Sequence, residues 1–169
     1  MTLNKLNQLS KELAKIKFLQ CCTSTIWVMR MVRELPFETE VELKNSAERA
    51  WMDLDENDYL EAFDGHPKIG DVNSLREKYS NTKALASGEQ RSVNHASEQV
   101  LLDLADGNNQ YLEKFGFIFI VCATGKTASE MLLLLQQRLP NDRVTELVNA
   151  AEEQRKIFQI RINKLLEDN

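Results

Sequence analysis

Glycine, proline and cysteine are scarce in this chain of 169 residues, which contains six, three and three of them respectively. So few glycines and prolines leave little room for flexible linkers, low-complexity tails or collagen-like repeats. The cysteines are odd in number, and Cys21 and Cys22 are neighbours while Cys122 is far away. This spacing suits neither a disulfide framework nor a usual zinc site, so we expect free thiols in a reducing compartment.

Positive charge and long apolar runs are lacking as well. The 21 Lys and Arg residues are outnumbered by 26 Asp and Glu residues, and the basic residues are scattered, which argues against nucleic acid as a partner. No apolar run reaches the roughly 18 residues that a membrane span needs, and the first residues lack the pattern of a signal peptide. We therefore expect a soluble, cytoplasmic protein without a membrane partner.

The residues that are present have ordinary globular proportions, with 43% hydrophobic and 28% charged. The length predicts one domain, residues 1–169. Apolar residues recur at spacings of three and four along most of the chain, which predicts a mostly α fold. Expected caps are Thr25, Thr39 with Glu42, and Thr127 with Glu130. The expected helices cover residues 11–20, 26–35, 40–54, 58–63, 87–105, 128–139 and a long last helix from Asn141 or Asp142 to Glu167.

One segment differs from its helical surroundings. Residues 117–122 are aromatic or β-branched apart from the final cysteine, and Gly116 and Gly125 lie on either side. Such residues favour an extended backbone, but no second strand is available to pair with them. Near residues 117–123 we therefore expect a short buried segment, either a helical turn or an extended insert whose backbone groups need partners from side chains or a ligand.

Two familiar kinds of site are disfavoured. The run from Ala123 to Thr127 ends in Gly-Lys-Thr like a P-loop, but Ile120 stands where that motif needs its first glycine, so a turn and a helix cap explain it better. With only His66 and His95, and no clustered carboxylates, a metal site is also not expected. His95 lies off the apolar stripe of its helix, which places it on the helix surface.

Three other residues are candidates for a polar pocket. His66 lies between Gly65 and Pro67 in the least helical part of the chain, where an imidazole can be presented at a cleft wall. Glu89 continues the apolar stripe of its helix, and Arg161 lies on or beside the buried seam of the last helix. A buried arginine needs a carboxylate, a carbonyl or an anionic ligand, so each charged residue is either half of a structural ion pair, a rim residue, or part of a substrate pocket.

The order of four motifs resembles that of the 2-oxo-4-hydroxy-4-carboxy-5-ureidoimidazoline (OHCU) decarboxylase family. They are His66-Pro67-Lys68-Ile69-Gly70-Asp71, Gly88-Glu89-Gln90, Asn109-Gln110-Tyr111-Leu112-Glu113-Lys114-Phe115-Gly116-Phe117 and Lys156-Ile157-Phe158-Gln159-Ile160-Arg161-Ile162. The likeness extends over nearly the whole chain. It implies an all-α fold of about eight or nine helices, usually a homodimer, that converts OHCU to (S)-allantoin in urate catabolism without a metal or an organic cofactor.

The resemblance also implies roles for individual residues. His66, Glu89 and Arg161 would be catalytic, with His66 as acid or base. The implied substrate-binding residues are Pro67, Ala86, Ser87, Gln90, Phe119, Ile120, Val121, Cys122 and Ala123, the last five through their backbone. The family commonly has a serine where Ala86 stands, and a loop insertion near residues 80–85 is expected. Two alternatives remain from the residues themselves: a helical binding module that keeps the pocket without turnover, and another small enzyme acting on a ureide.

Overall fold

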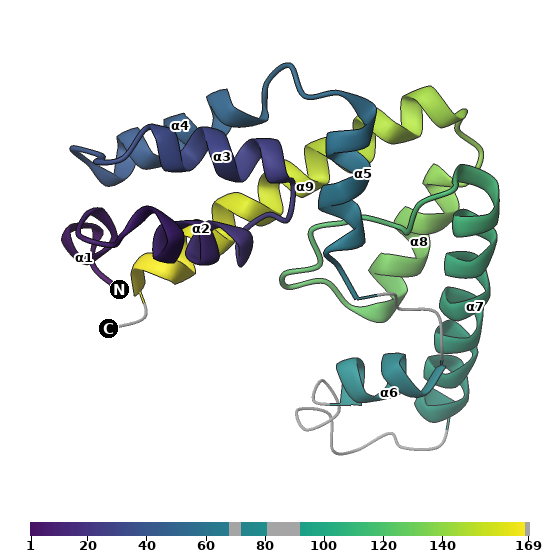
Figure 1. Cartoon of the computed structure of the whole chain (residues 1–169). Helices are drawn as coiled ribbons and strands as arrows, with labels where there is room; N and C mark the ends of the chain where they lie inside the picture. The colour runs from purple at the N-terminus through teal and green to yellow at the C-terminus, as the bar shows by residue number, and fades with distance from the viewer. Residues whose placement is uncertain (68–71, 81–91, 168–169) are drawn as a thin grey trace. The chain divides into compact units, whose positions relative to one another are not determined.

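The structure, a computed structural model, describes residues 1–67, 72–80 and 92–167. Within these ranges it contains nine helices and no strand, so the predicted all-α class is confirmed (Figure 1). The helices are α1 (Leu3–Asn7), α2 (Lys11–Leu19), α3 (Thr25–Arg33), α4 (Glu40–Trp51), α5 (Glu56–Asp64), α6 (Val72–Ser80), α7 (Ser92–Phe115), α8 (Ala128–Arg138) and α9 (Arg143–Glu167). None of these helices is long and apolar enough to cross a membrane.

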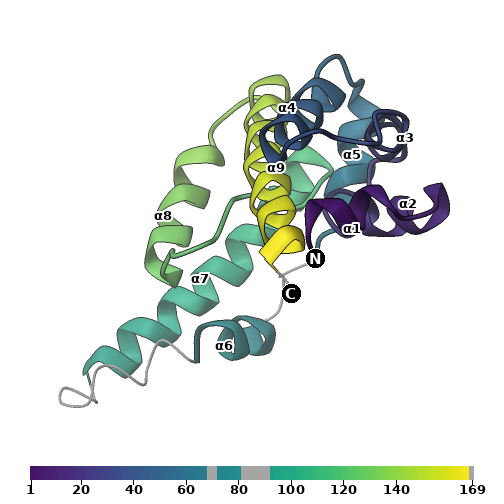
Figure 2. The same cartoon turned by 90° about the vertical axis from the view of Figure 1, so that its left-hand side faces the viewer.

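The helices group into two compact units, each with its own core. The first unit comprises residues 1–66 and 149–169, and the second comprises residues 67–148. In the first unit, α3 packs against α2, α4 and α5 (Figures 1 and 2). In the second, α7 packs against α6 and α8.

Aromatic side chains fill the core of the first unit around Trp27. Its ring lies 5.2 Å from that of Phe158 and 6.2 Å from that of Phe18, measured between centroids, and all three side chains are buried. The indole Nε1 donates to the carbonyl of Ala47 at 3.0 Å, so the one polar atom of this ring is satisfied. Phe158 belongs to α9, so the apolar periodicity of the last helix correctly indicates a buried face at this position.

The second unit has an aromatic cluster beside its only long irregular segment among the described residues, 116–127. The ring of Tyr111 lies 4.5, 5.9 and 5.2 Å from the rings of Phe115, Phe117 and Phe119. Of the two conformations that the sequence left open for residues 117–123, the structure adopts the non-helical one, with Ile120 buried.

Several predicted boundaries were wrong. Helix α7 continues to Phe115 instead of ending at Ala105, and it contains Gly107, where a Cβ would lie 2.6 Å from a Leu135 side-chain carbon. The glycine thus permits close packing of α8 and does not end the helix. Ser24, not Thr25, caps α3, and α1 and α6 were not predicted.

Some apolar residues that occur at helical spacing are nevertheless exposed. Leu13 and Ile16 of α2 are each 52% exposed, because Ala14 and Phe18 form the buried side of that helix. Val41 of α4 is also exposed. Val144 and Val148, at the start of α9, are 76% and 64% exposed, so the buried stripe begins only beyond them.

Candidate active site

The end of α5 places His66. Gly65 caps this helix, and the His66 amide donates to the carbonyl of Phe63 at 3.0 Å. A Cβ on Gly65 would collide with the side chain of Thr23, whose hydroxyl donates to the carbonyl of Glu61 at 2.9 Å. The absence of a side chain at Gly65 therefore lets the chain approach closely enough for Thr23 to satisfy the last turn of α5.

The imidazole of His66 contacts the last helix at Gln154. His66 Nε2 and Gln154 Oε1 are 2.5 Å apart, and Gln154 is completely buried. The other amide atom of this side chain, Nε2, has no hydrogen-bond partner among the described residues. Buried polar side chains rarely leave a donor unmet, so Gln154 is an unusual residue in this core.

Arg161 lies on the same face of α9 as Gln154, two turns further along the helix. Its Nη1 donates to the carbonyl of Cys21 at 3.1 Å, and its Nη2 lies 3.4 Å from His66 Nδ1. Among the described residues, no carboxylate pairs with this guanidinium. Of the three partner types predicted for this arginine, the structure therefore contains the carbonyl. The other N–H groups of the guanidinium can donate to an anionic or carbonyl-bearing molecule.

This environment favours an uncharged imidazole. Burial lowers the pKa of His66 below its ordinary value, the hydrogen bond with Gln154 partly opposes this, and the charge of Arg161 lowers the pKa further. At neutral pH the imidazole is therefore unprotonated and able to accept a proton.

The neighbouring cysteines are free thiols, as predicted for all three cysteines of the chain. Burial raises the pKa of Cys21 to about 11 and that of Cys22 to about 12. Both thiols are therefore neutral near pH 7 and add no charge beside His66.

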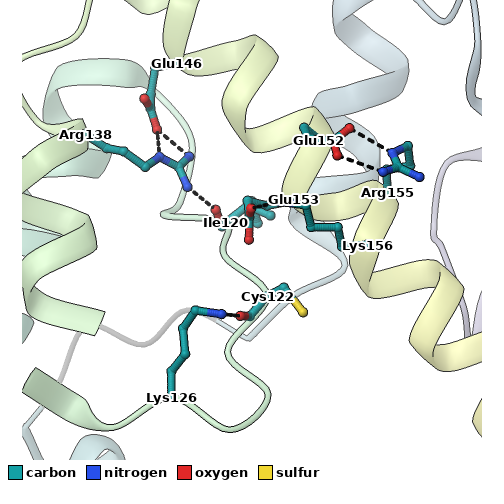
Figure 3. A network of polar contacts seen from close by, with 9 residues as sticks. All are labelled: Ile120, Cys122, Lys126, Arg138, Glu146, Glu152, Glu153, Arg155 and Lys156. Atoms are coloured by element: carbon teal, nitrogen blue, oxygen red, sulfur yellow. Dashed lines mark hydrogen bonds and ion pairs between the residues drawn. The ribbon is translucent and has the colours of Figure 1, made fainter. Parts of the chain in front are cut away.

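In the second unit, basic side chains hold the irregular segment through its carbonyl groups (Figure 3). Arg138 Nη1 donates to the carbonyl of Ile120 at 2.7 Å, and its guanidinium carbon lies 4.8 Å from the centroid of the Phe119 ring. Lys126 Nζ donates to the carbonyl of Cys122 at 2.6 Å, and its amide donates to the carbonyl of Ala123. Within the described ranges, the amides of Phe119, Ile120, Val121 and Ala123 donate to no group of the protein.

A buried carboxylate anchors Arg138 in turn. Glu146 accepts hydrogen bonds from Arg138 Nε and from the Tyr111 hydroxyl, and one from Asn141 Nδ2 at 2.8 Å. Burial alone would raise the pKa of Glu146, but these hydrogen bonds and the charge of Arg138 hold it below its ordinary value. Burial also raises the pKa of Tyr111, so its hydroxyl remains a donor.

The predicted site residues have different outcomes in the structure. His66 and Arg161 come together in the first unit, and Pro67 is exposed. Residues 119–123 belong to the irregular segment of the second unit. Ala86, Ser87, Glu89 and Gln90 lie outside the described residues, as do residues 81–85 of the insertion expected near residues 80–85. The Gly-Lys-Thr run forms a turn and a capping box with Glu130, as predicted.

Sequence reasoning missed Gln154, although the chain contains a signal for it. Gln154 lies three residues after Ala151 and four before Phe158, both of which are buried, and it precedes Arg161 by two helical turns. A polar residue on the buried face of an amphipathic helix needs a partner, so its position predicts a contact with another polar group.

The fold and the site together define a class: an all-helical protein in which a neutral imidazole lies between an amide oxygen and a guanidinium, an arrangement suited to proton transfer. Residues 7–163 match the family model for OHCU decarboxylase, so the chain belongs to this family. The family resemblance seen in the four sequence motifs is thus confirmed.

Individual relatives agree with this assignment. The chain is 32% identical over 160 residues to the uric acid degradation bifunctional protein TTL of Arabidopsis thaliana, covering 95% of this chain and 49% of the plant protein. It is 36% identical over 87 residues to the 2-oxo-4-hydroxy-4-carboxy-5-ureidoimidazoline decarboxylase of Amia calva, covering 48% and 50% of the two chains. The chain thus spans about half the length of these curated relatives.

A solved structure matches over a greater share of its length. A crystal structure of OHCU decarboxylase in the presence of (S)-allantoin aligns with a TM-score of 0.73 and 34% identity, covering 95% of this chain and all of the other. A crystal structure of (S)-allantoin synthase, at 17% identity and a TM-score of 0.72, shares the fold.

Proposed function

We propose that the protein decarboxylates 2-oxo-4-hydroxy-4-carboxy-5-ureidoimidazoline to (S)-allantoin during urate degradation. Family membership supports this carboxy-lyase activity, as do the urate-degrading and OHCU-decarboxylating relatives. The family resemblance extends the proposal to a reaction without metal or organic cofactor, carried out by a homodimer in the cytoplasm.

The chemistry of the reaction defines what the site must supply. The bond to the carboxylate breaks, carbon dioxide leaves, and the electron pair stays on a carbon conjugated with the ring imine. The hydroxyl on that carbon then loses its proton to become a carbonyl, the carbon that bears the ureido group gains a proton on one face, and the ring nitrogen that received the electron pair takes a proton from water. The protein must therefore accept a proton, return one to carbon, and stabilise charge that develops on the ring.

The His66 and Arg161 pair supplies groups for both needs. His66, whose pKa is lowered, starts unprotonated and takes the hydroxyl proton, while the guanidinium of Arg161 stabilises the developing negative charge. The juxtaposition of this neutral imidazole with a guanidinium that lacks a described carboxylate partner is the observation that carries the proposal. An arginine already paired with a carboxylate would have less to offer the substrate.

The remaining contacts of the substrate follow from the family resemblance. We propose that Glu89 is the third catalytic residue and that Gln90 binds the ureido and ring nitrogens, with Pro67 shaping the pocket. Ser87 replaces the hydroxyl that Ala86 lacks. In the segment from Phe119 to Ala123, three carbonyls already accept from Arg138 and Lys126. Within the described residues, the groups left to bind the substrate are the carbonyls of Phe119 and Val121 and the amides of Phe119, Ile120, Val121 and Ala123.

A histidine substitution tests the activity. His66→Gln should keep the fold but lower the enantioselective formation of (S)-allantoin by about 10² to 10⁴, the usual contribution of a general acid or base. The substrate is generated freshly from urate, and optical activity is followed by circular dichroism. His95→Gln is the matched control, because it alters the other histidine of the chain and should leave the rate unchanged.

The outcomes separate the activity from the alternatives. If wild-type protein binds the substrate without accelerating the reaction, the chain is a binding module and not an enzyme. Turnover that survives His66→Gln unchanged would refute the role of His66. A different product from the same ureide would point instead to a hydrolase or an isomerase.

A further inference from the structure

The groups around His66 determine which of its two nitrogens carries the proton. Arg161 Nη2 lies 3.4 Å from Nδ1, and a guanidinium offers only donors. A proton on Nδ1 would therefore face another N–H group. The favourable arrangement leaves Nδ1 bare as the acceptor, which requires the proton of the neutral ring to be on Nε2.

Gln154 meets this requirement at the other nitrogen. Gln154 Oε1 lies 2.5 Å from His66 Nε2 and accepts a hydrogen bond from the N–H group there. This orientation directs the amide nitrogen of Gln154 away from the imidazole. The amide nitrogen then has no hydrogen-bond partner among the described residues. The amide faces the thiol of Cys22, whose pKa burial raises and the amide in part lowers, but a thiol is a weak acceptor, so the orientation of Gln154 gives its well-paired atom, the oxygen, to His66.

The charges near the imidazole support the same arrangement. Arg161, on α9, lowers the pKa of His66, and the thiols of Cys21 and Cys22, between α2 and α3, stay neutral because their pKa values are raised. An imidazolium would place two positive groups side by side in a half-buried position. The neutral ring with one defined tautomer is therefore the resting state.

We propose that Gln154 is a positioning residue that holds the neutral His66 ring in its Nε2–H tautomer, so that Nδ1 is the nitrogen that exchanges protons with the substrate. The inference deepens the proposed function and rests on it for the identity of the substrate. After carbon dioxide has left, Arg161 Nη2, which lies at the long distance of 3.4 Å from Nδ1, donates to the substrate instead, so that the O–H bond of the substrate hydroxyl can break and an N–H bond can form at Nδ1. The imidazolium then returns this proton to carbon, and the neutral tautomer is restored.

A spectroscopic measurement tests the tautomer directly. Two-bond ¹H–¹⁵N correlation spectra of ¹⁵N-labelled protein with His95→Gln contain the signals of His66 alone, since the chain has two histidines. Above the pKa of His66 we expect the Nε2–H tautomer. Gln154→Leu should lower that pKa and give a mixture of tautomers, because it removes the hydrogen bond that raises the pKa.

A near-isosteric variant gives the opposite shift. Gln154→Glu places a carboxylate at the same distance, which favours the imidazolium and should raise the pKa of His66. The acid limb of the pH profile of kcat/KM should move to lower pH in Gln154→Leu and to higher pH in Gln154→Glu. We also expect kcat to be about 10- to 100-fold lower in the leucine variant, which is the range known for residues that orient metal-binding histidines. A packing role alone would not shift the profile in two directions.

The outcomes distinguish this inference from the proposed function. An Nδ1–H tautomer in wild-type protein, or a His66 pKa that ignores both substitutions at Gln154, would overturn the positioning role whatever the activity. Should wild-type protein form no allantoin while the tautomer and pKa respond as expected, the proposed function fails and the positioning of His66 stands.

Discussion

Two polar clusters of the molecule contain similar residues but differ in how fully their polar groups are paired. Around Glu146, a completely buried carboxylate meets Arg138, Tyr111 and Asn141, and the arginine also holds the carbonyl of Ile120. Around His66, by contrast, Arg161 meets a carbonyl and an imidazole, and the Gln154 amide nitrogen is unmet within the described residues. The first cluster has its charges matched internally, whereas the second keeps donor and acceptor capacity available.

The difference teaches how a fold of this size divides its arginines between stability and chemistry. A buried charge whose partners are all supplied by the protein contributes a defined geometry, here of the segment that includes Ile120. A half-buried charge with spare donors is more costly to the folded state, and such unmatched groups are typical of functional sites. The comparison predicts that substitutions in the first cluster affect stability, while those in the second affect chemistry.

The largest effect on stability is expected at Arg138. Arg138→Met leaves Glu146 buried without its charged partner, and breaking such a pair from one side typically costs about 3 to 5 kcal/mol. The free energy of unfolding from urea denaturation measures this loss. Arg49→Met is the matched control: Arg49 and Glu34 form an ion pair whose side chains are 54% and 41% exposed, so its loss should cost at most about 1 kcal/mol. Equal costs for the two variants would contradict the comparison.

Arg161 should show the reverse pattern. Arg161→Met is expected to lower kcat/KM for OHCU about 10²- to 10³-fold, the usual range for one electrostatic donor, while the free energy of unfolding changes by less than about 1 kcal/mol. The same substitution should raise the pKa of His66, because the charge of Arg161 lowers it. Steady-state kinetics, urea denaturation and NMR titration check the three expectations. A large loss of stability would place Arg161 with the structural arginines.

The smallest expected effect is a dependence of stability on pH. Since the pKa of His66 is lower in the folded protein than its ordinary value of 6.5, the unfolded chain binds more protons in the window between the two. The contribution of His66 to stability therefore falls as pH decreases through that window and is constant below it. Urea denaturation of wild-type and His66→Gln protein at several pH values isolates this contribution. A difference that grows in the opposite direction would mean that the folded state favours the imidazolium.

Glu146 acts in a different pH range and provides an internal reference. Its pKa is lowered in the folded protein, so its stabilising effect is complete above its ordinary value of 4.5 and is lost as pH falls through the folded pKa. The stabilising effect of Glu146 should therefore begin to be lost at a lower pH than that of His66, because the two ordinary pKa values are 4.5 and 6.5.

Local sequence signals predicted the fold class and the position of Arg161 on the last helix. Helical periodicity and the Thr127–Glu130 capping box have a range of a few residues, and both were confirmed. The predicted end of α7 at Ala105 was wrong, and the role of Gly107 just beyond it depends on Leu135 of another helix. Such a contact between distant parts of the chain has no local signature.

The same limit applies to the polar residues. The sequence placed Arg161 on the buried seam and predicted that it would need a partner, but the carbonyl of Cys21 lies 140 residues away and could not be identified. The position of Gln154 in an apolar stripe indicates a polar contact, but it does not identify His66 as the partner. The resemblance to a family provided His66, whereas spacing alone gave only a loop histidine.

The close approach at Gly65 has a consequence for mutational surveys of this protein. Gly65 is exposed, and a ranking of positions by burial would treat it as tolerant. Yet a methyl group there would have to displace Thr23 and with it the final turn of α5, the turn that determines the direction of the His66 ring. A solvent-facing residue with no functional group thus belongs among the determinants of reactivity, and a survey that scores only folded yield would miss its importance.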